Sequence, residues 1–137
     1  MLALAYDAAL RREELCSLRT GNLDLAYRML WIRAETTKTR RERMVPCSAS
    51  IGVLLSDYLR HRAMLSRPAG RCSCPNRRNL AEPLTLWTWS KVVRRVALAA
   101  EVPRFSTHTT RRLCLTDLAR AGLGTACDRD VRRAPLH

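Results

Sequence analysis

The chain has 137 residues, 47% of them apolar, which is enough for one domain with a hydrophobic core and hardly enough for two. Its 25 basic residues against 12 acidic ones give a net charge of +13, which points to a polyanionic partner, most commonly nucleic acid, with an anionic membrane surface as the weaker alternative. No apolar run is long enough to cross a bilayer and residues 1–7 do not resemble a signal peptide, so we expect a cytoplasmic protein, nucleoid-associated if bound to DNA, and no membrane partner.

The N-terminal segment predicts a helix that is interrupted once. Residues 1–19 have helical periodicity with a break near Asp7, and a Thr-Gly-Asn tripeptide then ends the pattern. Leu10, Leu15 and Leu18 form the apolar stripe, so we expect them in the core.

A β-hairpin and a second helix are predicted next. Residues 29–34 and 42–47 have the composition of strands, and the polar, basic residues 36–41 between them predict an exposed cationic tip. A helix capped by Ser48 then reaches about Met64. Its expected buried positions are Ile51, Leu54, Leu55, Tyr58 and Leu59.

A loop and a third helix follow. Residues 66–83 contain several prolines and arginines and predict a loop. A helix begins at Thr85 and ends before Pro103, with Trp89 expected to be partly exposed. Its expected buried positions are Trp87, Val92, Val93 and Val96.

The last predicted helix carries the most informative pattern. Ser106 or Thr107 suits its N-cap and Gly122 suits its C-terminal end. His108 and Arg111 are three residues apart, so both project from one face of the first turn. The same face carries Leu115 and Leu118. The pattern therefore aims a histidine and an arginine inward at a helix N-terminus, where an anion is stabilised.

The cysteines indicate core packing rather than disulfides or metal binding. Cys16 and Cys114 lie on apolar helical faces and are expected to be small core residues. Without a secretion signal, a disulfide framework is not expected. Cys72 and Cys74 are separated by one residue, whereas zinc pairs usually need two to four, so we expect no metal site.

Three blocks of sequence, taken together and in order, resemble the tyrosine recombinases of the phage integrase class. Residues 9–15 (Ala-Leu-Arg-Arg-Glu-Glu-Leu) resemble their first arginine box, usually Gly-Leu-Arg-x-Ser-Glu-Leu. Residues 37–46 resemble their lysine-bearing hairpin, and residues 108–111 (His-Thr-Thr-Arg) their His-x-x-Arg box. The resemblance covers about residues 1–123 and implies a mainly α fold with a small β-hairpin or sheet (α+β), a catalytic domain incomplete at both ends.

The resemblance also implies a chemistry, in which a tyrosine attacks a DNA phosphodiester and leaves a 3′-phosphotyrosine. Arg11 and Arg111 then hold the non-bridging oxygens with fixed, always-charged donors, and Glu14 orients Arg11. Lys38 protonates the departing 5′ oxygen, and His108 helps to manage the proton of the nucleophile. No metal or other cofactor is needed, because the arginines supply the electrostatic stabilisation.

Three of these residues also have a simpler interpretation, whereas an arginine on an apolar face, such as Arg111, needs a partner. Arg11 forms an ordinary helical ion pair with Glu13 or Glu14, Lys38 is one of several solvated charges, and His108 extends a helix cap. The other basic residues of the hairpin are themselves candidate contacts to DNA phosphates: Arg40, Arg41 and Arg43.

The sequence departs from the resemblance beyond the His-x-x-Arg helix. The Gly-His box and the nucleophilic tyrosine are missing, and Tyr6, Tyr27 and Tyr58 all precede His108. Residues 124–137 lack periodicity and predict a disordered tail outside the family pattern, produced by a frameshift or premature stop near residue 123. The N-terminal domain that clamps DNA in this class is also expected to be absent.

Three functions remain open at this point. The first is a recombinase fragment that binds double-stranded DNA, with other recombinase protomers as candidate partners, and that is inactive alone. The second is a non-enzymatic DNA-binding protein that modulates a full-length recombinase, and the third is a pseudogene product that barely folds. None of them needs a small-molecule substrate.

Overall fold

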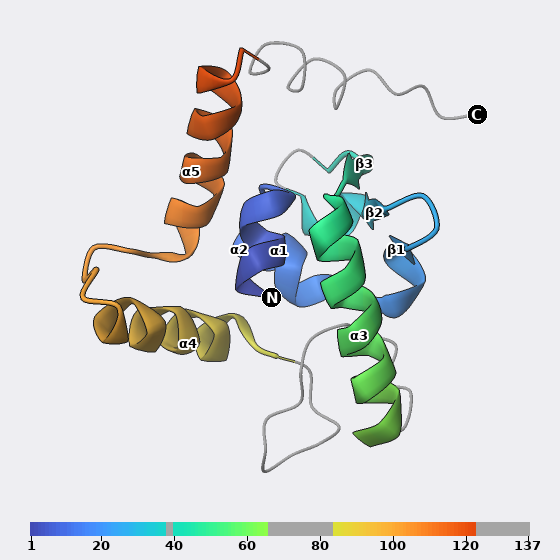
Figure 1. Cartoon of the computed structure of the whole chain (residues 1–137), viewed down its shortest axis with the longest axis horizontal. Coiled ribbons are helices and arrows are strands. Elements are labelled where there is room, and N and C mark those ends of the chain that lie inside the picture. Colours follow the sequence, from blue (N-terminus) through green and yellow to red (C-terminus); the bar gives the residue numbers. More distant parts are fainter. Residues whose placement is uncertain (38–39, 66–83, 123–137) are drawn as a thin grey trace.

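The computed structural model describes residues 1–37, 40–65 and 84–122, which form a mainly helical domain with one three-stranded antiparallel sheet (Figure 1). The helices are α1 (Leu2–Asp7), α2 (Arg12–Ser17), α3 (Ala49–Leu65), α4 (Leu86–Ala99) and α5 (Thr107–Arg120). The strands are β1 (Leu23–Asp24), β2 (Met29–Ile32) and β3 (Arg43–Pro46), with short 3-10 turns at Thr20–Asn22 and Ala34–Thr36. The predicted α+β class is confirmed. No helix within these ranges is long and apolar enough to cross a membrane.

The predicted break in the first helix is confirmed. Helix α1 ends at Asp7, and Ala9 takes a left-handed conformation with φ of 47°, which is uncommon for a residue other than glycine. The backbone N–H of Leu10 still donates to the carbonyl of Ala5, so the chain turns tightly before α2 begins. The Leu10 side chain at this turn is buried in the core.

The predicted hairpin is β2 and β3, paired antiparallel with Leu30 opposite Val45 and Ile32 opposite Arg43. Leu30, Ile32 and Val45 are buried, whereas Trp31 between the first two is exposed, so the side chains alternate between the two faces. Strand β1 and the two 3-10 turns were not anticipated, because elements of two or three residues are too short to show periodicity.

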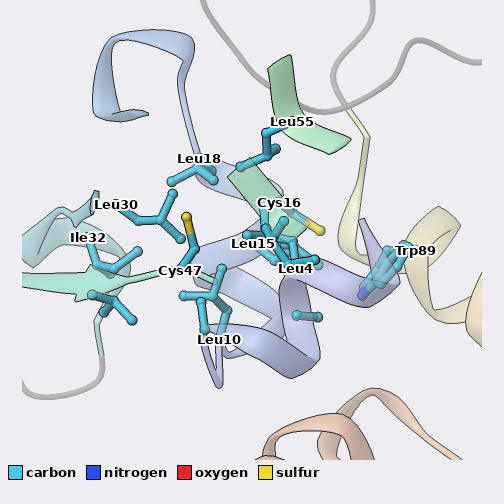
Figure 2. Packing of buried hydrophobic residues seen from close by; sticks show 14 of the residues in the cluster. Leu4, Leu10, Leu15, Cys16, Leu18, Leu30, Ile32, Cys47, Leu55 and Trp89 are labelled. Atoms are coloured by element: carbon cyan, nitrogen blue, oxygen red, sulfur yellow. The ribbon is translucent and has the colours of Figure 1, made fainter. Parts of the chain in front are cut away.

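The core lies where α1, α2, the sheet, α3 and α4 meet (Figure 2). Its side chains include Leu4, Leu10, Leu15, Cys16, Leu18, Leu30, Ile32, Cys47, Leu55 and Trp89. The predicted stripe of Leu10, Leu15 and Leu18 is therefore confirmed, as is the burial of Cys16 and Cys114.

Helix α3 begins as predicted. The Ser48 hydroxyl accepts the backbone N–H of Ile51 at 3.4 Å, and the backbone N–H of Ser48 donates to the Asp7 carboxylate at 2.7 Å. Ile51 and Leu55 are buried as expected, but Leu54 is exposed. Because α3 covers only one side of the core, a single row of its apolar residues is buried and Leu54 lies outside that row.

The buried face of α4 differs from the prediction. Trp89, Val93 and Ala97 are buried, at intervals of four residues along one line of the helix. Three of the expected positions are exposed instead: Trp87, Val92 and Val96. Helix α4 rests mainly on α2, so only this row is covered, and the apolar residues beside it remain in contact with solvent.

The ends of α5 agree with the prediction. Ser106 is the N-cap, and it forms a capping box with Thr109, whose hydroxyl accepts the Ser106 backbone N–H at 2.9 Å. Gly122 has φ of 77° directly after the last turn, a conformation that glycine adopts without strain.

The predicted inward face of α5 is wrong. The helix packs against α1, and the residues that it buries there are Thr110 and Cys114. Asp117 continues this row and accepts a hydrogen bond from the Tyr6 hydroxyl of α1 at 2.5 Å. His108 and Leu115 are exposed, and Arg111 and Leu118 are only half-buried, because all four lie beside this row rather than on it.

Leu15 tests the proposed core. It is 1% exposed, so Leu15→Ala should lower the free energy of unfolding by about 2–5 kcal/mol through lost burial and a residual cavity. Val53→Ala on the exposed face of α3 is the matched control and should change it by less than about 0.5 kcal/mol. Urea denaturation measures both, and equal effects would contradict the assignment of the core.

Candidate functional site

A cleft of about 780 Å³ opens between α2, the 3-10 turn before the hairpin tip, and the first turns of α4 and α5. Its lining includes Arg11, Glu13, Thr37 and His108. Two residues singled out in separate sequence blocks, Arg11 and His108, therefore share one cleft.

Arg11 is fixed at the start of α2. Its backbone N–H donates to Glu14 Oε2 at 2.8 Å, and its Nη1 donates to Glu14 Oε1 at 3.3 Å. About a third of its side chain remains exposed. The guanidinium is thus held on one side by Glu14 and keeps donors available to the cleft.

Glu14 has a second partner that sequence analysis did not assign to it. Arg43 of β3 donates from Nη1 to Glu14 Oε1 at 2.8 Å and from Nη2 to Oε2 at 2.7 Å, a bidentate pair. Arg43 had been grouped with the exposed basic tip, yet only 14% of its side chain is exposed. Strand alternation offered a signal, because Arg43 lies two residues before the buried Val45 and so shares its face.

These contacts keep Glu14 ionised. Burial alone would raise the pKa of its carboxyl, but the hydrogen bonds from Arg43 and from the Arg11 backbone, together with both guanidinium charges, lower the pKa below its usual value. A buried carboxylate without such partners would be strongly destabilising.

Arg111 lies close to the first arginine box. It is half-buried, and its Nη1 donates to the carbonyl oxygen of Ala9, two residues before Arg11. The left-handed turn at Ala9 presents this carbonyl to α5. The main chain of the first box therefore anchors the arginine of the third.

The sequence model of the phage integrase family matches residues 1–127. The chain belongs to this family. A tyrosine recombinase from Thermosipho africanus (strain TCF52B) is 31% identical over 123 residues, which are 89% of this chain and 40% of that protein.

Two solved structures share the fold of this chain. XerA recombinase superposes with a TM-score of 0.76 at 21% identity, covering 88% of this chain and 42% of that one. The Tn1549 transposon integrase in complex with a circular intermediate DNA superposes with a TM-score of 0.75 at 18% identity, covering 89% and 46%. The chain spans less than half the length of these relatives.

The structure of this phage integrase family member brings part of the predicted site together. Arg11 and His108 line one cleft, Glu14 binds Arg11, and Arg111 binds the turn before Arg11. Lys38 lies outside the described residues, as does the predicted loop 66–83 and the tail 124–137. The roles of these residues in a reaction remain predictions.

The base of the hairpin tip is held in place. The Thr37 hydroxyl accepts the backbone N–H of Arg41 at 3.0 Å and lies 3.1 Å from the Arg41 carbonyl, to which it donates. Thr37 itself is buried, whereas Arg40 and Arg41 are exposed. These two arginines are thus presented to solvent on a tip with a fixed base.

Two further side chains shape the chemistry of the cleft. The backbone N–H of Glu13 lowers the pKa of its own carboxyl, desolvation opposes this, and the hydrogen bond and charge of Arg12 lower it further. Glu13 therefore lines the cleft as a carboxylate. Burial raises the pKa of the Cys16 thiol to about 11, which leaves it protonated and unreactive at neutral pH. No three His, Cys, Asp or Glu side chains within residues 1–37, 40–65 and 84–122 are grouped to hold a metal.

The lowered pKa of Glu14 predicts a loss of stability in acid. In the unfolded chain, the pKa of a glutamate is about 4.3. The stability that ionised Glu14 contributes is therefore complete above this pH, and it is lost as the pH falls through the lower pKa of Glu14 in the folded chain. Glu14→Gln should lower the free energy of unfolding by about 3 kcal/mol at pH 7, because Arg43 loses its charged partner.

Urea denaturation from pH 7 down to pH 3 measures this effect. The difference between the native chain and Glu14→Gln should narrow in acid, while Glu42→Gln, at an exposed position of the hairpin, should follow the native profile. A difference that is constant over this range would show that Glu14 is not a buried ion.

The conformation of Ala9 predicts a stabilising substitution. A residue other than glycine in the left-handed region is strained, so Ala9→Gly should raise the free energy of unfolding by about 1 kcal/mol. Ala3→Gly, at an exposed position inside α1, is the control and should lower it by about 1 kcal/mol. Thermal denaturation followed by circular dichroism distinguishes the two, and destabilisation by Ala9→Gly would contradict the strain.

Proposed function

We propose that this chain is a DNA-binding fragment of a site-specific tyrosine recombinase, that it holds a DNA phosphate in the cleft of Arg11 and His108, and that it does not cleave DNA alone. The observation that carries the proposal is the shared cleft. It brings Arg11 and His108, from two boxes far apart in sequence, to one place where a phosphodiester could bind. The Tn1549 integrase and the XerH recombinase bound to a difH substrate, both similar in fold, are DNA complexes.

The electrostatics of the chain suit this partner. A net charge of +13 favours DNA, and guanidinium groups bind phosphate oxygens through paired, permanently charged donors. Arg11 keeps part of its side chain exposed in the cleft. Arg111 is not among the described residues that line the cleft, but it is anchored to the turn beside Arg11. The carboxylate of Glu13 forms an ion pair with Arg12 at 3.0 Å, which offsets part of its negative charge at the cleft.

The roles that we propose are those implied by the resemblance to the family. Arg11 and Arg111 stabilise the negative charge on the non-bridging oxygens, with Glu14 holding Arg11. His108 exchanges a proton with the attacking group, and Lys38 of the hairpin protonates the leaving oxygen. The partial catalytic domain, about residues 1–123, acts on DNA in the cytoplasm, with other recombinase protomers as its expected protein partners.

The tyrosines support a lack of cleavage by the isolated chain. The sequence contains no tyrosine beyond His108. The Tyr6 hydroxyl is bound to Asp117, and this hydrogen bond raises the pKa of Tyr6, which makes it a poorer nucleophile. Tyr27 and Tyr58 lie on the turn between β1 and β2 and on α3, and neither lines the cleft.

DNA binding by the purified chain tests the proposal. Affinity for a short duplex, measured by fluorescence anisotropy, should fall at least about tenfold between about 50 and about 200 mM salt, because phosphate contacts release counterions. Arg11→Ala and Arg111→Ala should each weaken binding about tenfold, whereas Arg60→Ala, an exposed arginine paired with Asp57 on α3, should change it less than about twofold.

A nicked suicide substrate tests the second half of the proposal. It should yield no covalent protein–DNA adduct with this chain alone. An adduct would refute the lack of cleavage, and salt-insensitive binding would refute the phosphate site.

A further inference from the structure

The ion pair between Arg43 and Glu14 is built differently from the other ion pairs described in the chain. Both oxygens of the carboxylate accept from the Arg43 fork, at 2.8 and 2.7 Å, and the Glu14 side chain has no exposed surface. By contrast, Arg12 with Glu13 and Arg60 with Asp57 are partners on the surface. A geometry of this kind fixes direction as well as charge.

The same two oxygens hold Arg11. Glu14 Oε2 accepts the Arg11 backbone N–H at 2.8 Å, and Oε1 accepts the Arg11 guanidinium at 3.3 Å. The carboxylate is therefore a bridge, with strand β3 on one side and the residue that lines the cleft on the other. Any rotation of the Glu14 carboxylate moves the acceptors of Arg11.

We propose that Arg43 is a positioning residue, which orients Arg11 through Glu14 and does not itself contact DNA. This inference rests on the proposed function, in which Arg11 binds the phosphate. It replaces the alternative in which Arg43, with Arg40 and Arg41, contacts phosphates from the hairpin tip.

The physical reason is the competition for Glu14. With Arg43 in place, each carboxylate oxygen has a strong, short partner and Arg11 Nη1 is held by the longest of the four bonds. Without Arg43, the buried carboxylate has Arg11 as its remaining charged partner and draws that guanidinium toward itself and out of the cleft. A lysine at position 43 keeps the charge but cannot bond both oxygens in one plane, so it should not hold the carboxylate in place.

A double-mutant cycle on DNA affinity separates positioning from direct contact. Arg43→Lys should weaken binding roughly tenfold, equivalent to about 1.4 kcal/mol. In the double variant, Arg43→Lys should weaken binding no further than Arg11→Ala alone, because Arg43 affects binding only by positioning Arg11. If Arg43 contacted phosphate directly, the two losses would multiply instead, and the proposal would be overturned.

Arg41 provides the matched control. It lies two residues earlier in the same hairpin, is exposed, and has no described bond to Glu14. Whatever the effect of Arg41→Lys, it should combine additively with Arg11→Ala. Comparing the two double variants thus distinguishes an effect of Arg43 on Arg11, exerted through Glu14, from a general change in the hairpin.

A measurement without DNA keeps this inference separate from the proposed function. In the free protein, the side-chain Nε–Hε resonance of Arg11, observed by NMR, should shift and narrow in Arg43→Lys and remain unchanged in Arg41→Lys. If the native chain binds no DNA, the proposed function fails but this test still stands. An Arg11 resonance that ignores Arg43→Lys overturns the inference even if DNA binds.

A second variant tests the inference if Arg43→Lys fails to fold. If Arg43→Lys does not give a cooperative thermal transition, the paired variant Glu14→Gln with Arg43→Gln removes both buried charges together and restores a neutral pair. That variant should fold and should still displace the Arg11 resonance. Native-like Arg11 behaviour in the folded pair would show that the bridge does not position Arg11.

Discussion

A single buried carboxylate organises the part of this domain that faces the cleft. Glu14 accepts hydrogen bonds from the main chain and guanidinium of Arg11 and from both nitrogens of the Arg43 fork. Burying this charge is unfavourable unless all of these hydrogen bonds form. The cost of burial is therefore offset only when α2 and β3 are correctly placed against each other. The packing of helix against hairpin and the placement of Arg11 are thus one constraint.

Most of the elements could be predicted from the sequence, because their signals are local. The break after Asp7, the hairpin, and the caps Ser48, Thr85 and Ser106 each depend on a few neighbouring residues. Short-range periodicity and capping chemistry determine such features before any tertiary contact forms.

The rotation of the helices could not be predicted in the same way. Helix α4 contains apolar residues on more than one side, and only its packing on α2 selects Trp89 and Val93 over Trp87 and Val92 for burial. For α5, the contact with α1 selects Thr110 and Cys114 over Leu115. Composition shows that such a helix has an apolar face, but the neighbouring element decides which row is used.

The candidate site was predicted unevenly for a related reason. Residue types and order were sufficient to single out Arg11, His108 and Arg111, and the structure places the first two at one cleft. The role of Arg43 depends on a partner 29 positions away, and a cationic hairpin conceals it among exposed arginines. Strand alternation places Arg43 on the buried face of β3. The role of a charged residue on a buried face can be assigned only when the residue that pairs with it is known.

The turn at Ala9 gives the two arginines unequal tolerance to sequence change. Arg111 is anchored by a main-chain carbonyl, so any residue at position 9 that can adopt the left-handed turn preserves the acceptor. Arg11 depends on a side chain, which a single codon change can remove. As mutations accumulate, the position of Arg111 on α5 should therefore be retained longer than the position of Arg11 at the start of α2.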